Sequence, residues 1–335
     1  MIQGLYSVPE VTEMIGRGDV LLLAGDVDLL AQLPAGKWIG GSTTRFILHA
    51  DELVESHDKI FVHNLSEIAG EIKISVYDPS TISNIFDDAY DNGFSVLIMA
   101  WGSDTLKEYS INVSSYHNFA CKVICGWITK NFFDNENPDI SKAVCGKDGS
   151  LHSNSGVVMH VALPADKYAE VHTFSPFKQG KGDVFMFEEN GLQVENACIN
   201  GIKQNFRQYL ESQKIDRSVE CIVAGDFAGT IMNVYLLRDQ KSDRGKYVSF
   251  SAPVYGGVEY RFAEIDLSYE EPTSFEGDIV FSLTCITNYT QPEVFKKYLR
   301  NMHGPFTYGE IAYHLMNHAT IYVTVGNVQE PVYAS

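Results

Sequence analysis

The chain carries little positive charge. It has 25 lysine and arginine residues against 43 aspartate and glutamate residues, which gives a formal net charge of −18. No run of basic residues interrupts this acidic background. Because proteins that hold nucleic acids neutralise phosphates with clustered cations, we expect no nucleic-acid partner.

Long apolar runs are also missing. No stretch approaches the roughly 18 apolar residues that a membrane-spanning helix needs. The first residues, MIQGLYSVPEVTEMIGRGD, lack the basic segment and apolar stretch of a signal peptide. Hydrophobic residues still make up 45% of the 335 residues, as in an ordinary globular protein. The sequence therefore predicts a soluble cytoplasmic protein with no membrane partner.

Cysteine is sparse, with six residues spread along the chain. Most lie in apolar runs such as FACKVICGWI and VECIVAG, which favours reduced core thiols over disulfides. Cys121 and Cys125 are four residues apart, but no second pair of cysteines or histidines accompanies them at zinc-binding spacing. We therefore predict no zinc site there.

The motifs of well-known enzyme chemistry are missing as well. The sequence contains no G-x-S-x-G, G-x-G-x-x-G or H-E-x-x-H motif. In GKWIGGSTTRF the lysine precedes the double glycine, whereas in a phosphate-binding P-loop it follows the glycines beside the hydroxyl. We therefore predict neither a nucleotide nor any other cofactor.

What the sequence does contain is a series of apolar segments with the pattern of β-strands. The clearest are residues 20–26, 37–47, 59–65, 72–77, 94–101, 122–128, 156–164, 219–237, 247–265, 277–289 and 320–325. A hairpin is expected at Asn190-Gly191. Helices are expected after the capping box SVPE and over residues 79–93, 202–214 and 292–302. Together these predict an α+β fold with mixed β-sheets and flanking helices.

The chain also suggests two halves. Residues 134–154 are polar and rich in glycine, asparagine and aspartate, which predicts a long loop between an α/β half, 1–150, and a β-rich half, 151–335. LLLAGD at residues 21–26 matches CIVAGD at residues 221–226, and a double glycine follows each, at residues 40–41 and 256–257. This leaves open that the two halves are structurally related.

The segment GPFTYGEIAYHLMNH places Glu310, His314 and His318 four residues apart, as metal ligands on one helix face would be. However, Thr307 and Glu310 match the capping box T-x-x-E, which already explains the glutamate. Three such ligands would also span about 12 Å along a helix, too far for one ion. We therefore expect a capped helix and no native metal site, while adventitious binding by the two histidines stays open.

Segments at both ends of the chain resemble one family. LLLAGDVDLLAQLPAGKWIGGSTTRF, VFSLTCITNY and GPFTYGEIAYHL resemble stand-alone bacterial proteins of unknown function that are themselves similar to the FIST sensory domain. FIST domains are regarded as sensors of small molecules such as amino acids. The resemblance implies a noncatalytic ligand-binding protein of intracellular bacterial signalling, which acts with a separate signalling protein.

The resemblance also implies a ligand surface built from two distant groups of residues. These are Gly40, Gly41, Ser42, Thr43 and Arg45 in the first group, and Cys285, Asn288, Tyr308, Gly309 and Glu310 in the second. Arg45 would meet a ligand carboxylate and Glu310 a ligand ammonium group. Two alternatives stay open: a hydrolase or transferase that uses Cys285 or Ser42 as its nucleophile, and a protein-interaction role for the loop 134–154.

Overall fold

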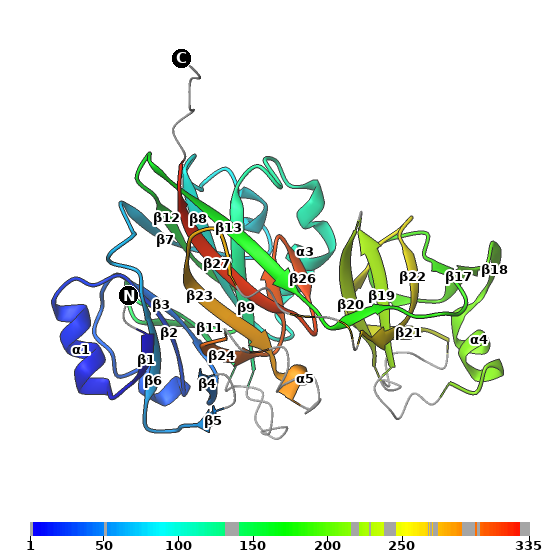
Figure 1. Cartoon of the computed structure of the whole chain (residues 1–335), viewed down its shortest axis with the longest axis horizontal. Coiled ribbons are helices and arrows are strands. Elements are labelled where there is room, and N and C mark those ends of the chain that lie inside the picture. Colours follow the sequence, from blue (N-terminus) through cyan, green and yellow to red (C-terminus); the bar gives the residue numbers. More distant parts are fainter. Residues whose placement is uncertain are drawn as a thin grey trace, which may run out of the picture. The chain divides into compact units, whose positions relative to one another are not determined.

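The structure is a computed structural model (Figure 1). It describes residues 3–49, 52–130, 141–215, 221–227, 229–237, 246–266, 268, 270, 274–289, 299 and 302–328. Most of the predicted helix 292–302, and the first part of the predicted loop 134–154, lie outside these residues.

The chain forms two compact units. The first comprises Met1–Phe174, Glu271–His314 and Thr320–Ser335, and the second comprises Ser175–Glu270 and Leu315–Ala319. These bounds differ from the predicted halves 1–150 and 151–335. The reason is that strands β12 (Gly156–Ala162) and β13 (Lys167–Phe174), which follow residue 150, pair with other strands of the first unit.

The first sheet of the first unit is built around the apolar run that ends at Gly25. Its order is β1-β6-β2-β3-β10-β11, with β1 (Gln3–Tyr6), β2 (Leu21–Gly25), β3 (Trp38–Ser42), β6 (Ile60–Asn64), β10 (Ala143–Cys145) and β11 (Ser150–His152). Helix α1 (Val8–Gly16) begins at the predicted capping box of Ser7 and Glu10. It buries Val11 and Met14 in a cluster with Leu21 and Leu23 of β2.

The second sheet has the order β26-β25-β9-β8-β12-β7. Its further strands are β7 (Ile72–Tyr77), β8 (Gly93–Ala100), β9 (Val123–Thr129), β25 (Glu310–Ala312) and β26 (His314–Met316). Strands β8 and β9 run parallel, and the chain passes between them through α3 (Asp104–Asn112) and the 3-10 turn η2 (Val113–Ser115). Parallel strands need such a crossover connection. The strands predicted over 94–101 and 122–128 are confirmed as β8 and β9.

The third sheet joins the two ends of the chain. Its order is β13-β27-β23-β24-β4-β5, with β4 (Arg45–His49), β5 (Glu52–Glu55), β23 (Asp278–Cys285), β24 (Gly304–Thr307) and β27 (Thr320–Asn327). Two short helices, α2 (Val27–Leu30) and α5 (Ile286–Tyr289), follow β2 and β23. Strand β24 pairs antiparallel with β4. Segments more than 250 residues apart in the sequence therefore become neighbours.

The second unit is a nine-stranded half-barrel with one helix, α4 (Phe206–Ser212). Its strands are β14 (Phe177–Gln179), β15 (Phe185–Met186), β16 (Gly191–Val194), β17 (Asn196–Ile199), β18 (Ile202–Asn205), β19 (Cys221–Phe227), β20 (Thr230–Leu236), β21 (Val248–Val254) and β22 (Glu259–Ile265). Aromatic rings fill its interior; Phe187, for example, lies 5.5 Å from Phe206 and 5.3 Å from Tyr260 between ring centroids. The short piece Leu315–Ala319 adds His318, whose ring packs on Phe177 and Tyr235.

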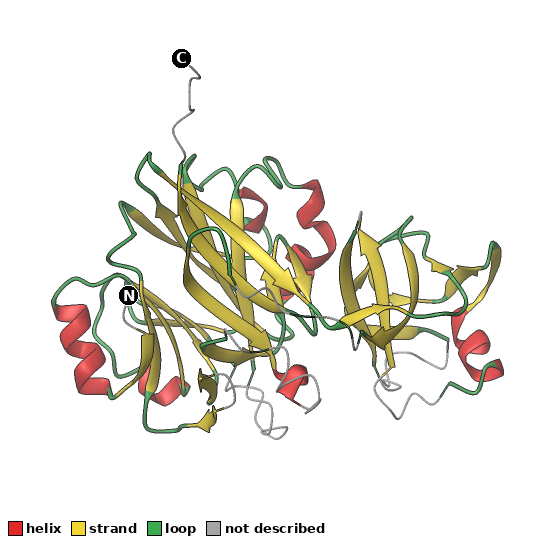
Figure 2. Ribbon diagram, in the orientation of Figure 1, coloured by secondary structure: helices red, strands yellow, loops and turns green. Residues whose placement is uncertain are grey.

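The α+β prediction is wrong, because strands account for 50% of the structure and helices for only 13% (Figure 2). Residues 304–318 form β24, β25 and β26 instead of a helix, because β24 pairs with β4 and β25 pairs with β9. Tyr313 and His318 also adopt positive φ angles of 60° and 53°, outside the helical region. The helical part of residues 79–93 is limited to the 3-10 turn η1 (Ile82–Asn84). Residues 202–205 form strand β18 before α4 begins.

The idea of two related halves also fails. LLLAGD forms β2, which runs parallel to β3, whereas CIVAGD forms β19, which makes an antiparallel hairpin with β20. Gly40 and Gly41 lie inside β3, but Gly256 and Gly257 lie between β21 and β22. The hairpin expected at Asn190-Gly191 is absent from the described strands too, because β15 pairs with β17 and β22 while β16 pairs with β21.

The helices of the described residues are short. None of them is long and apolar enough to cross a membrane. The first unit instead buries its apolar residues between sheets, with Trp38, Phe61, Trp127 and Phe281 among its fully buried side chains.

Candidate ligand-binding pocket

The pairing of β4 with β24 places the turn between β3 and β4 against the end of β24. Ser42 ends β3 and Arg45 begins β4, so Thr43 and Thr44 form the turn. The Thr43 hydroxyl donates a 2.9 Å hydrogen bond to the carbonyl oxygen of Phe306. This buried bond fixes the turn to the strand that leads to Tyr308.

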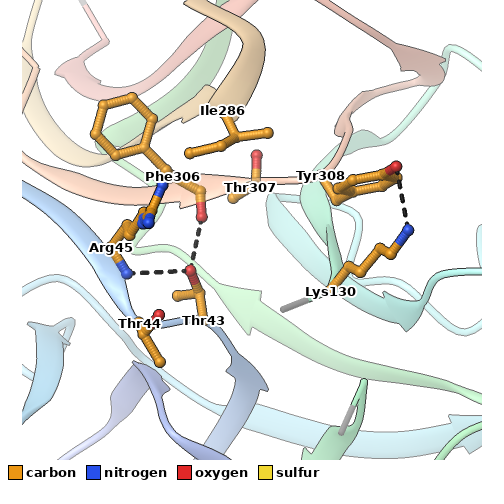
Figure 3. A pocket seen from close by; sticks show the side chains of 8 residues that line it. All are labelled: Thr43, Thr44, Arg45, Lys130, Ile286, Phe306, Thr307 and Tyr308. Carbon is orange, nitrogen blue, oxygen red and sulfur yellow. Dashed lines mark hydrogen bonds between the residues drawn. The ribbon is translucent and has the colours of Figure 1, made fainter. Parts of the chain in front are cut away.

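A small pocket opens beside this bond, and we call it the Arg45 pocket (Figure 3). It is lined by Thr43, Thr44, Arg45, Lys130, Ile286, Phe306, Thr307 and Tyr308. Its interior volume is about 10 Å³, and about 280 Å³ when the open mouth is counted. An interior of that size holds roughly one water molecule, so the pocket suits one terminal group of a ligand.

Two cationic side chains line the Arg45 pocket. Lys130 Nζ lies 3.2 Å from the Tyr308 hydroxyl (Figure 3) and 4.3 Å from the centroid of the Tyr308 ring. It also lies 5.6 Å from the centroid of the Trp101 ring. Such aromatic faces attract an ammonium group. Among the described residues no carboxylate forms an ion pair with Lys130, so its described neighbours leave its charge uncancelled.

Arg45 is held differently. Its guanidinium lies 3.4 Å from Glu55 on the neighbouring strand β5, and its side chain is only 15% exposed. Glu55 is 48% exposed, so water weakens this ion pair. An arginine guanidinium carries five N–H donors in a planar fork, a geometry that suits an oxyanion.

The threonines contribute hydroxyl groups that differ in how they are engaged. Thr43 donates to Phe306, and its oxygen lies 3.5 Å from the Arg45 backbone nitrogen. The Thr307 hydroxyl lies 2.6 Å from Oε1 of Glu310 and 3.2 Å from the carbonyl oxygen of Thr284. The Thr307 hydroxyl is therefore engaged by interior groups. Of the three threonines in the lining, Thr44 has the hydroxyl best placed to bond a ligand.

Only some of the ten predicted site residues lie at the Arg45 pocket. Thr43, Arg45 and Tyr308 line the Arg45 pocket, whereas the other seven do not. Glu310 is completely buried, Ser42 accepts a hydrogen bond from the Lys142 amide, and Asn288 donates to Thr284. The carbonyl of Gly309 accepts from the Ile128 amide, in the pairing that places β25 beside β9.

The double glycine has a packing role. A Cβ atom on Gly41 would lie 2.6 Å from Thr129 Cγ2, 2.6 Å from Trp127 Nε1 and 2.9 Å from Ile98 Cγ2. Gly40 has more room, with its nearest neighbour at 3.3 Å. Gly41 therefore lets two sheets approach closely.

Several lining residues were not predicted from the sequence: Thr44, Lys130, Ile286, Phe306 and Thr307. Lys130 directly follows β9. A polar residue at the end of a buried strand was therefore the available signal.

The predicted nucleophiles are buried. Cys285 is 1% exposed and its sulfur accepts a 2.9 Å hydrogen bond from the Thr287 hydroxyl, while Ser42 is 2% exposed. A nucleophile must reach its substrate, so neither side chain is placed to attack one in this conformation.

The segment with Glu310, His314 and His318 is not a ligand-bearing helix. The Thr307 hydroxyl lies 2.6 Å from Oε1 of Glu310, but this bond joins two side chains on successive strands, whereas a capping box bonds each side chain to a backbone amide at a helix start. Burial lowers the pKa of His314 to about 4 and that of His318 to about 3. Throughout the described ranges, no three His, Cys, Asp or Glu side chains are grouped as a metal site would require.

The Arg45 pocket and both sheets around it fall within one region of family similarity. A family model described as a family of unknown function, DUF6976, matches residues 6–326. The chain belongs to the DUF6976 family. Curated proteins give no match, and the DUF6976 match provides no link to the FIST domain. The function of this DUF6976 protein must therefore be argued from its own geometry.

Proposed function

We propose that this protein binds the carboxylate, or a similar oxyanion end, of a small molecule in the Arg45 pocket and does not transform it. The observation that carries the proposal is the presence of Arg45 and Lys130 in one pocket with the Thr44 hydroxyl. Cationic N–H donors together with a hydroxyl form charge-assisted hydrogen bonds to oxyanions.

The size of the pocket limits what enters it. An interior of about 10 Å³ accepts one oxygen-sized group, so the body of the ligand would remain at the mouth. A small carboxylate fits this division, because its charged end is compact. The overall charge of −18 disfavours anions at long range, so binding depends on the local cations and weakens as salt screens them.

The mouth favours an amino acid over a simple carboxylate. Glu310 was predicted to meet a ligand ammonium group, but its side chain is buried and cannot do so. Glu55 is outside the pocket lining but pairs with Arg45 and is half exposed, so it is the carboxylate we propose for this contact. An α-amino acid would then place its carboxylate toward Lys130 and its ammonium group toward Glu55.

A sensory role in bacterial signalling, with a separate signalling protein as partner, stays part of the proposal and rests on the resemblance to FIST proteins. Burial of Cys285 and Ser42 supports binding over catalysis by those residues. A sensor returns its ligand unchanged, whereas a hydrolase or transferase would consume it.

Calorimetric titration of the purified protein with acetate, glycine, L-glutamate and inorganic phosphate tests the proposal. We expect saturable binding of at least one carboxylate, weakened about tenfold in Arg45→Gln and in Lys130→Met, the scale of a charged hydrogen bond. Arg17→Gln is the matched control, because Arg17 is an exposed arginine that also pairs with a carboxylate, Asp19. It should leave the affinity unchanged.

Each other outcome counts against the proposal. No saturable binding by the wild type would remove the ligand class, and equal losses in Arg45→Gln and Arg17→Gln would show that only net charge matters. Consumption of the ligand during the titration, detected by NMR, would favour the enzyme alternative.

A further inference from the structure

The larger of the two cavities described here lies elsewhere in the first unit, and we call it the Tyr77 cavity. It is lined by Ile74, Ser75, Val76, Tyr77, Thr81, Asn84, Asp88, Cys145, Lys147 and Asp148. It is an open groove with a volume of about 500 Å³, which is widely accessible to solvent. This volume lies in the usual range for small-molecule sites, and no lining residue is shared with the Arg45 pocket.

Two sheets form the walls of the Tyr77 cavity. One wall is β7, which ends the order of its sheet, and the other is the end of β10 with the turn that follows it. A strand at the end of a sheet directs alternate backbone N–H and C=O groups away from its one partner. The cavity therefore has backbone as well as side-chain groups with which to bind a polar molecule.

A chain of hydrogen bonds runs from the interior to this cavity. The Ser95 hydroxyl lies 2.8 Å from His160 Nδ1, and His160 Nε2 lies 3.2 Å from the Tyr77 hydroxyl. Tyr77 then donates a 2.7 Å bond to Oδ2 of Asp88, whose Oδ1 accepts a 2.6 Å bond from Lys73. Ser95 and His160 are buried, whereas Asp88 is 39% exposed and reaches the cavity.

The proton positions in this chain follow from the environment of each group. Burial lowers the pKa of His160 to about 4 and raises that of Tyr77, so both are neutral at neutral pH. The hydrogen bond from Lys73 is the main cause that lowers the pKa of Asp88. Since Tyr77 keeps its proton and Asp88 has lost its own, the tyrosine donates, and Asp88 is a fixed acceptor at the cavity wall.

The rest of the lining mixes donors, acceptors and apolar surface. Hydroxyls come from Ser75 and Thr81, an amide from Asn84, and apolar surface from Ile74 and Val76. The charges nearly balance, because the two lining carboxylates, Asp88 and Asp148, are accompanied by Lys147 in the lining and by Lys73 bound to Asp88. Such a cavity gains little from a net charge on its ligand and much from a ligand with many hydroxyl groups.

We infer that the Tyr77 cavity is a second binding site, which takes a neutral polyhydroxylated molecule the size of a monosaccharide or cyclic polyol. Asp88, held by Tyr77 and Lys73, accepts hydrogen bonds from ligand hydroxyls, and Asn84 can both donate and accept. Ile74 and Val76 offer apolar surface to the C–H face of the ligand. A free anion would meet Asp88 and Asp148 at the wall.

Ligand-observed NMR titration of the full chain with D-glucose, D-ribose, myo-inositol and glycerol tests this inference. We expect saturable binding of at least one ring compound and weaker binding of glycerol, which is too small to reach both walls. Asp88→Asn should weaken binding about tenfold, since it removes charge-assisted acceptance. Val76→Trp, at a position 40% exposed in the folded protein, should block the cavity and abolish binding.

Asp87→Asn is the matched control. Asp87 is adjacent in sequence and bonds to His117 and Asn118, and it does not line the cavity. It should leave binding intact. Absence of saturable binding by any of the four compounds, or equal affinities in Asp88→Asn, Val76→Trp and wild type, would overturn the inference. Arg45→Gln serves to separate the two sites, because it should affect carboxylates alone.

Discussion

Thr43 and Phe306 are joined by a 2.9 Å hydrogen bond from the threonine hydroxyl to the phenylalanine carbonyl, although they are 263 positions apart in sequence. Both residues are buried. The bond holds the turn that carries Arg45 against the strand that carries Tyr308, so the Arg45 pocket depends on it.

Replacement of Thr43 by valine tests this dependence. Valine keeps the shape but leaves the Phe306 carbonyl without this donor, and we expect a loss of about 1–2 kcal/mol in the free energy of unfolding. Thr44→Val is the control, since the Thr44 hydroxyl makes no side-chain hydrogen bond within the described part of the chain. Urea unfolding followed by tryptophan fluorescence measures both; equal losses would contradict the assignment.

Gly41 should tolerate no side chain. A Cβ there would lie within 3 Å of Trp127, Thr129 and Ile98, all in the interior. We expect Gly41→Ala to destabilise the first unit by about 1–3 kcal/mol through overpacking. Gly40→Ala, where the nearest atom would be 3.3 Å away, should cost clearly less.

The same fluorescence measurement distinguishes these two glycines. All three tryptophans, Trp38, Trp101 and Trp127, belong to the first unit, so the signal reports the unfolding of that unit alone. If the two alanine variants unfold at the same urea concentration, close packing at Gly41 is not the reason for the glycine.

Stability should fall as the pH is lowered from about 6.5 to 4, in part because of His160. Burial lowers its pKa to about 4 in the folded state, with Lys73 acting in the same direction and Asp88 against it. The unfolded chain, with the ordinary value of about 6.5, binds more protons in this window, which favours unfolding by up to about 1.4 kcal/mol per pH unit.

The His160→Gln variant isolates this contribution. It should be less stable than the wild type at pH 7, because Ser95 and Tyr77 lose their partner, yet its stability should fall less steeply toward pH 4. His117→Gln, at a position with 77% side-chain exposure, should keep most of the slope. Urea midpoints measured at half-unit steps of pH give the comparison, and parallel curves for His160→Gln and wild type would refute it.

Thiol reactivity tests the enzyme alternative. Cys121 is exposed, whereas Cys125, Cys145 and Cys285 are buried, and burial raises the pKa of Cys125 and of Cys145. Because the thiolate is the reactive form, a disulfide reagent should label Cys121 first in the native protein. Cys121→Ser should remove this fast phase and Cys285→Ser should keep it; rapid labelling of Cys285 would instead support a nucleophilic role.

Local patterns predicted much of the secondary structure. The continuous apolar runs at residues 20–26, 59–65 and 94–101 form β2, β6 and β8, because a strand covered on both faces has no polar side to display. Helix α1 begins where Ser7 and Glu10 cap each other. In each case the decisive interactions lie within a few residues.

The errors arose where distant partners decide the structure. Residues 304–312 pair with β4 and β9, and these partners cannot be seen in the helix-like spacing of the segment itself. The resemblance to FIST proteins implied Arg45 and Tyr308 as site residues but did not include Lys130. Only the register of Glu310 with Trp127 brings Lys130 beside Tyr308.

The second unit is completed by residues far from the rest of its sequence. Ser175–Glu270 supplies its strands, but His318, which packs on Phe177 and Tyr235, comes from Leu315–Ala319. During synthesis the ribosome therefore has to extrude the chain beyond His318 before this half-barrel receives that core side chain. A nascent chain stalled at Glu270 would contain every strand of the half-barrel and still lack a part of its interior.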